Sequence, residues 1–171
     1  MQGSQAYENY PVWMVLGSNL LSISMYLIGA TILYQIGLIW LVLYLLFILL
    51  LELRLVKGHC VDCYYYGKTC AFGKGRLSCM FFPKGTPDRF SRRLITKKDL
   101  LPDFLVFFIP LVVGLVLLIR DFSWILLILV IALFILGFAG NALVRGQIAC
   151  RYCKQREIGC PAQRLFERPE K

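Results

Sequence analysis

Long uncharged, apolar stretches dominate the chain and predict membrane-spanning helices. No Asp, Glu, Lys or Arg occurs between Asn9 and Leu51. As one helix this stretch would be about 65 Å long, roughly twice the thickness of the hydrocarbon core of a bilayer. It must therefore fold back on itself. Gln35 and Gly37 interrupt the apolar run, so we expect helices over residues 13–33 and 38–53, joined by a turn at residues 34–37.

A second apolar pair follows the first. Residues 104–119 are uncharged, residues 120–123 form a short polar break, and residues 124–144 are apolar again. This pattern predicts two further helices and so a bundle of four transmembrane helices. With 58% hydrophobic and only 17% charged residues among 171, the composition also departs from that of soluble domains, which supports the same class.

A cysteine pattern recurs after each pair of apolar stretches. Two triplets share the spacing C-x(2)-C-x(6)-C; they are Cys60, Cys63 and Cys70, and Cys150, Cys153 and Cys160. The preceding segments, Leu-Val-Lys-Gly at 55–58 and Leu-Val-Arg-Gly at 143–146, also match. We therefore predict an all-α integral membrane protein, a four-transmembrane-helix bundle made of two repeated hairpins, each followed by a cytoplasmic cysteine loop.

The distribution of basic residues predicts how the chain is oriented across the membrane. Eleven lie from Arg54 to Lys98 and seven from Arg145 to Lys171, and Arg120 is the other one of the nineteen. Because cytoplasmic loops retain Lys and Arg, we expect both termini and both cysteine loops to be cytoplasmic, in the cell (plasma) membrane. The predicted segments are an N-terminal segment (1–12), a first transmembrane hairpin (13–58), a cysteine loop with an amphipathic segment (59–99), a second transmembrane hairpin (100–146) and a C-terminal cysteine segment (147–171).

The two cysteine triplets predict a metal site. Cytosolic thiols stay reduced, and clustered ones bind metal or do redox work. Zinc takes four tetrahedral ligands, so one triplet is a ligand short, whereas six thiolates satisfy two zinc ions if two of them bridge. This spacing resembles the fungal zinc binuclear cluster, in which six cysteines hold two zincs. The resemblance implies a site for two zinc ions, and its ligands here would be Cys60, Cys63, Cys70, Cys150, Cys153 and Cys160. No DNA-binding role follows from it, because a membrane-tethered site lacks the coiled-coil dimer and free basic helix of those factors.

The seventh cysteine leaves a second partition open. Cys79 could join the first triplet around a zinc ion or an iron–sulfur cluster, because thiolates suit both. His59 could then complete the second triplet. We favour the six-cysteine arrangement because the repeat gives Cys79 no counterpart. Cys79 and His59 are therefore secondary candidates, and an iron–sulfur cluster is the alternative cofactor.

A basic amphipathic segment separates the first triplet from the third predicted helix. Thr86 and Pro87 predict a helix start, and Phe90 begins an apolar face that basic residues surround. Such a helix lies in the headgroup plane of an anionic leaflet, although a positive-inside loop without lipid specificity explains the same pattern. The basic residues are Arg89, Arg92, Arg93, Lys97 and Lys98.

The sequence favours an accessory protein over an enzyme. It has no H-E-x-x-H, G-x-S-x-G or phosphate-loop motif, and positive-inside retention explains the net charge of +9 without a nucleic acid partner. Asn19, Tyr26 and Asn141 are polar candidates for a pocket within the helices, which side-chain packing also explains. We expect a small membrane protein whose zinc–cysteine cluster clamps its cytoplasmic face, with anionic lipid, a protein partner or an oligomer as its partner. An iron–sulfur electron-transfer protein is the alternative.

Overall fold

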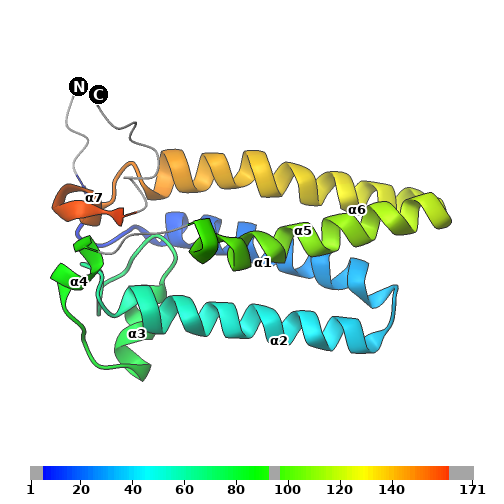
Figure 1. The fold of residues 1–171 in the computed structure, drawn as a ribbon. Helices are drawn as coiled ribbons and strands as arrows, with labels where there is room; N and C mark the ends of the chain where they lie inside the picture. Colours follow the sequence, from blue (N-terminus) through cyan, green and yellow to red (C-terminus); the bar gives the residue numbers. More distant parts are fainter. Residues whose placement is uncertain (1–5, 93–96, 162–171) are drawn as a thin grey trace, which may run out of the picture.

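The computed structural model describes residues 6–92 and 97–161, and most of this part of the chain is helical. Its long helices run side by side, and short helices gather at one end of them (Figure 1). The long helices are α1 (Val12–Tyr34), α2 (Leu38–Leu55) with its π-helical continuation η1 (Val56–Cys60), α5 (Lys97–Arg120), and α6 (Trp124–Ile135), which continues through η2 (Leu136–Gly140) and η3 (Ala142–Ala149). The short helices are α3 (Lys74–Phe81), α4 (Pro87–Arg92) and α7 (Lys154–Gly159).

Four segments of the described chain are long and apolar enough to cross a membrane, which confirms the predicted number of apolar spans. They are Val12–Tyr34, Leu38–Cys60, Leu101–Arg120 and Trp124–Ala149. Their outer faces expose large apolar side chains; Leu20 is 67% exposed and Ile125 is 71% exposed. A soluble monomer rarely exposes large contiguous apolar patches, whereas lipid tails cover such faces favourably.

Both predicted turns join their helices where the sequence indicated. The N–H of Gly37 donates to the carbonyl of Tyr34 at 3.1 Å, and Gly37 has a φ of 147°, which favours glycine. After the second turn, α6 starts with the N–H of Leu127 donating to the carbonyl of Ser123 at 2.9 Å. Both turns lie at the end of the bundle opposite α3, α4 and α7 (Figure 1).

Helix α1 occupies the centre of the bundle, since it contacts α2, α5, α6 and η3. One buried cluster joins α1 to α5 and α6; its members include Met25, Ile32, Phe107, Leu126, Val130 and Leu133. Another joins α1 to α2 and α5 and includes Leu33, Tyr44, Ile48, Leu51 and Val106. Within it, the Tyr44 hydroxyl donates to the carbonyl of Val106 at 2.9 Å. Dense packing on α1 therefore holds the two hairpins together.

The second and fourth helices extend further than the charge pattern predicted. The second was expected to end at residue 53 and the fourth at residue 144, but they reach Cys60 and Ala149. Arg54 does not end the second helix because its guanidinium is exposed and pairs with Asp99 at 3.6 Å. Val56, two residues later, is buried and favours continuation of the helix. The helices thus deliver both cysteine triplets directly to one end of the bundle.

Non-spanning segments gather at this end, and we call them the cap. The cap consists of residues 6–11, 61–92 and 150–161 of the described chain, and it includes α3, α4 and α7 (Figure 1). Every cysteine except Cys60 lies in the cap, and Cys60 is the last residue of η1. The chemistry predicted for the cysteine loops is therefore located here.

Candidate functional site

The N-terminal segment runs between the two cysteine loops and hydrogen-bonds to both. The N–H of Tyr7 donates to the carbonyl of Tyr152 at 3.0 Å, and the N–H of Tyr10 donates to the carbonyl of Thr69 at 2.9 Å. The Tyr10 hydroxyl donates to the carbonyl of Ala149 at 2.5 Å. Residues far apart in the sequence are thus joined by backbone groups, a connection that sequence reasoning missed.

Tyr65 forms the centre of this connection. Its hydroxyl donates to the carbonyl of Tyr7 at 2.6 Å and accepts from the N–H of Lys154 at 3.0 Å. The ring packs 5.5 Å from that of Tyr10, centroid to centroid, and only 2% of the residue is exposed. Burial raises the pKa of Tyr65 to about 12, so its hydroxyl remains a donor at neutral pH. Tyr65 thus packs the cap together with the tyrosines on either side of it.

Gln155 is a buried polar side chain that joins the two loops. Its Oε1 accepts from the N–H of Tyr64 at 2.7 Å, and its Nε2 donates to the carbonyl of Gly159 at 3.1 Å. Because 98% of the residue is shielded from solvent, loss of either contact would leave a desolvated polar group. A lone Gln in a polar segment gave no sequence signal for this role.

An exposed ion cluster closes the outer side of the cap around Glu8. The Lys68 ammonium lies 2.8 Å from the Glu8 carboxylate, and Lys154 and Tyr64 also hydrogen-bond to this carboxylate. These contacts, that of Lys154 first, lower the pKa of Glu8 from 4.5 to about 2. Glu8 is thus ionised at neutral pH, and it contacts one lysine from each cysteine loop.

Cysteines of both triplets pack against one buried cluster, which includes Tyr10 and Tyr65; they are Cys63, Cys70 and Cys153. In each loop the N–H of the second cysteine donates to the carbonyl of the first at 3.4 Å; the pairs are Cys63 with Cys60 and Cys153 with Cys150. Burial raises the pKa of Cys63 to about 12, and the nearby thiols of Cys153 and Cys60 add to this shift. Burial likewise raises the pKa of Cys153 to about 11. These thiols are therefore neutral side chains that pack in the cap.

The cysteines do not form a ready set of metal ligands. Among the described residues, no three His, Cys, Asp or Glu side chains are arranged to hold a metal ion. All seven cysteines are free thiols; Cys79 is exposed, beside Gly67. The His59 ring lies edge-on to Phe90, with centroids 6.4 Å apart. The arrangement gives no support to a zinc or iron–sulfur centre, which stays a prediction from the cysteine spacing.

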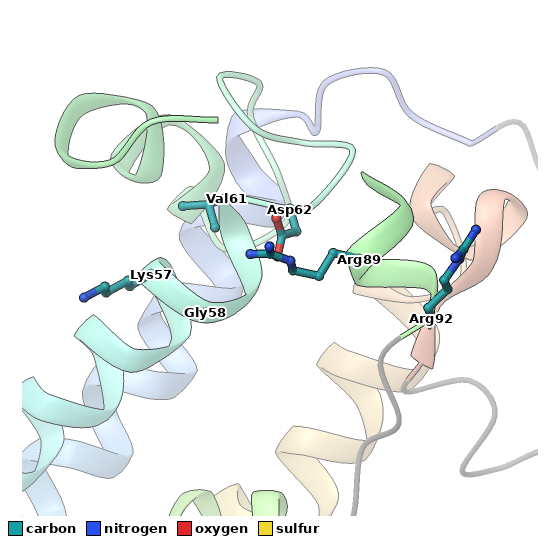
Figure 2. A pocket seen from close by; sticks show the side chains of 6 residues that line it. All are labelled: Lys57, Gly58, Val61, Asp62, Arg89 and Arg92. Atoms are coloured by element: carbon teal, nitrogen blue, oxygen red, sulfur yellow. The ribbon is translucent and has the colours of Figure 1, made fainter. Parts of the chain in front are cut away.

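A basic cavity of about 560 Å³ opens between η1 and α4. Its described lining includes Lys57, Arg89 and Arg92, together with the carboxylate of Asp62. Figure 2 shows the Arg89 side chain extending from α4 toward Asp62, with Lys57 and Arg92 on opposite sides in this view. Asp62 is only 4% exposed, and its Oδ1 accepts from the N–H of Thr86 at 2.9 Å. Asp62 therefore fixes the start of α4 beside the cavity.

The predicted basic amphipathic segment is described in part. Helix α4 begins at Pro87, as predicted, and Arg89 and Arg92 are exposed on it. Arg93 lies outside the described residues, as do the side chains of Lys97 and Lys98. The cavity adds Lys57 from η1, a residue that the sequence did not single out because it lies outside the amphipathic segment.

Comparisons with known proteins give no relative. A scan against protein-family models, a search of curated proteins and a search of solved structures each find no match to this chain. The function is therefore inferred from the residues of the cap and the helices.

Proposed function

We propose that the protein is an integral membrane accessory module that binds anionic phospholipid through its cap. The cap faces the cytoplasm in this proposal, and the membrane is the cell membrane. Bound lipid would anchor the cap and present its exposed surface to a partner protein or a second copy of the chain. The proposed role is binding and does not include catalysis.

The basic cavity between η1 and α4 is the observation that carries this proposal. Lys57 follows α2 directly, at the level where a spanning helix enters the headgroup region, and Arg89 and Arg92 come from α4 beside it. Arginine forms bidentate hydrogen bonds with phosphate, and lysine adds a point charge. Each basic residue near an anionic membrane surface contributes about 1 kcal/mol to binding. With Asp62 as the one acidic residue of the described lining, the three basic residues leave the cavity with net positive charge, which suits a phosphate-bearing headgroup.

The charge distribution supports the orientation. Arg120 lies at the second turn, opposite the cap, whereas the other eighteen of the nineteen Lys and Arg residues lie at or after the cap ends of the second and fourth spans, in residues 54–98 and 145–171. Retention of such residues on the cytoplasmic side would place the cap there. The matching Cys63–Cys60 and Cys153–Cys150 hydrogen bonds and the repeated cysteine spacing support an origin of the two hairpins by duplication of one unit.

Lipid retention tests the proposal. The protein is reconstituted in nanodiscs of phosphatidylcholine and phosphatidylglycerol, released into detergent, and analysed by native mass spectrometry. We expect retained phosphatidylglycerol to exceed phosphatidylcholine, and replacement of Lys57, Arg89 and Arg92 by Gln to lower the excess about tenfold or more.

A matched variant distinguishes a site from diffuse charge. It replaces three exposed basic residues of the cap outside the cavity lining, Arg76, Lys84 and Arg156, by Gln. This variant should retain phosphatidylglycerol as the wild type does. Equal losses in the two triple variants would reject a specific cavity, and equal retention in all three proteins would reject lipid binding by the cap.

A second candidate adds a metal to the cap, as either a zinc module or an iron–sulfur electron-transfer protein. It rests on the repeated cysteine spacing, which brings two triplets of thiols to one end of the bundle. Metal analysis and a visible spectrum of anaerobically purified protein test it. About two zinc ions per chain would support a shared zinc site, a visible absorption that bleaches on reduction would support iron–sulfur, and metal-free, stably folded protein would reject both.

A further inference from the structure

A second cavity, of about 370 Å³, lies where α1, α2 and the start of α3 meet. Helix α1 contributes the polar groups of Asn19, Ser22 and Tyr26, α2 contributes Glu52, and α3 contributes Lys74. The remaining lining residues are Ile23, Phe72, Gly73 and Leu77. Asn19 and Tyr26 thus line a cavity, whereas Asn141, the third polar candidate of the sequence, does not belong to this lining.

An ion pair forms the polar floor of this cavity. Lys74 Nζ lies 2.5 Å from Glu52 Oε2, and the Tyr26 hydroxyl donates to Glu52 Oε1 at 2.8 Å. Each carboxylate oxygen therefore has one donor, while a carboxylate offers about four lone-pair sites. Acceptor capacity remains on Glu52. Because the two charges already neutralise each other, a charged ligand would have to separate them.

The hydrogen-bond donors of the α1 side chains are already used within the protein. The Asn19 amide group donates to the carbonyls of Val15 at 2.8 Å and Phe72 at 3.3 Å. The Ser22 hydroxyl donates to the carbonyl of Ser18 at 3.2 Å. These side chains and Tyr26 thus offer a ligand acceptor oxygens, and Lys74 offers ammonium hydrogens. The complementary ligand group donates several hydrogen bonds, accepts at least one, and carries no charge; a cluster of hydroxyls satisfies all three conditions.

The cavity also reaches the outer, apolar face of the bundle. Ile23 is 52% exposed within the first candidate span, and Leu77 is 44% exposed. Gly73 allows the loop to approach α1, because its φ is 70° and a Cβ there would lie 3.4 Å from Val15 Cγ1. With α1 in a membrane, acyl chains would run beside Ile23 while a headgroup entered the polar floor.

We infer that this cavity binds the uncharged, polyhydroxyl headgroup of a glycolipid. The inference rests on the proposed membrane placement of the helices but not on the anionic-lipid site, which lies in a different cavity with different lining residues. The volume falls within the range of small-molecule sites, and the Glu52 carboxylate accepts from the headgroup hydroxyls while Lys74 donates to them.

Competition between lipids in native mass spectrometry tests this inference. The probe is monoglucosyldiacylglycerol, and phosphatidylglycerol with the same acyl chains is the charged comparison. An amine-oxide detergent is used because maltoside detergents carry the same hydroxyl chemistry. We expect the wild type to retain one glucolipid. Glu52→Gln should reduce retention about tenfold, the factor that corresponds to about 1.4 kcal/mol, through the weakened acceptor.

Two further variants keep the test decisive if Glu52→Gln perturbs the ion pair and the fold. Ile23→Trp fills the cavity from an exposed position and should abolish retention of the glucolipid. Leu27→Trp, one turn along α1 and 63% exposed but outside the lining, should not. The Gln triple variant at Lys57, Arg89 and Arg92 should retain glucolipid while losing phosphatidylglycerol. Equal glucolipid retention by the two Trp variants, or displacement of glucolipid by equimolar phosphatidylglycerol, would overturn the inference.

Discussion

The Tyr10 hydroxyl donates a 2.5 Å hydrogen bond to the backbone carbonyl of Ala149. Tyr10 comes just before α1, and Ala149 is the last residue of η3, so one bond joins the cap ends of the first and fourth candidate spans. Both residues are buried. The contact holds the end of η3 against the start of α1 and fixes where the second cysteine loop begins.

Tyr10→Phe should therefore destabilise the protein although it preserves the ring. The buried carbonyl of Ala149 would lose its donor, at a cost of about 1–3 kcal/mol. Equilibrium unfolding in mixed detergent micelles measures this loss. Tyr34→Phe is the control, because Tyr34 is 59% exposed at the opposite turn, and it should change stability by less than about 0.5 kcal/mol. Equal effects of the two changes would contradict the role of the Tyr10 contact.

Stability should depend on pH through Glu8. Its pKa falls from 4.5 to about 2 in the folded protein, chiefly through Lys154 and then Lys68. Because folding favours the ionised carboxylate, Glu8 stabilises the folded protein fully above pH 4.5, and this stabilisation is lost as the pH falls toward 2. The melting temperature of Glu8→Gln should consequently change less than that of the wild type across this interval. Glu157→Gln, an exposed change on α7, should retain the wild-type profile.

The salt dependence of stability tests the ion pairs of Glu8 a second time. Glu8 is exposed, so its attraction to the two lysines is screened by salt. The difference in melting temperature between the wild type and Glu8→Gln at neutral pH should shrink as the salt concentration rises. A difference that does not respond to salt would indicate that Glu8 acts through packing.

Gly75→Ala should destabilise the cap. A Cβ at this buried position would collide with the carbonyl oxygen of Tyr65 and lie 2.6 Å from that of Lys68, and backbone atoms cannot rotate away. Overpacking of this kind costs about 1–3 kcal/mol. Gly17→Ala is the matched control, because no atom lies within 4 Å of its Cβ position and alanine favours the helix by about 1 kcal/mol. Thermal unfolding should move in opposite directions for the two variants.

Thiol modification should distinguish Cys79 from Cys63. Cys79 is exposed, whereas burial raises the pKa of Cys63 from 9.0 to about 12. Since the thiolate is the reactive form, iodoacetamide at neutral pH should alkylate Cys63 at least about a hundredfold more slowly than Cys79. A time course of peptide mass spectrometry measures both rates, and full denaturation should bring them together. Similar rates in the folded protein would show that the cap does not shield Cys63.

The spans were predictable because their signals are local. An uncharged run fixes the existence of a helix, and Gln35 and Gly37 mark where the first pair turns. The end of the second helix was predicted wrongly because the prediction used Arg54 as the edge of the apolar run. Its charge is satisfied at the surface by Asp99, a residue of another helix. A local pattern cannot reveal such a partner.

The sequence predicted which loops carry the cysteines but not the contacts that join these loops in the cap. The cysteine spacing drew attention to both loops. The groups that join the loops are backbone carbonyls of Tyr7 and Ala149 and a buried Gln155. Backbone groups are common to every sequence, so no motif marks the ones that act as acceptors. The convergence of ligand side chains on a metal likewise depends on three-dimensional placement, which spacing alone does not determine.

The position of Tyr7 and Tyr10 against residues 149–152 has a consequence for biogenesis. A ribosome releases the N-terminal end of a chain first, so the partners of these tyrosines emerge only after the last helix has been translated. If one helix failed to insert, the remaining odd number of crossings would leave the two ends on opposite leaflets, and they could not meet. The cap can therefore close only after every helix between these two segments has been translated and inserted.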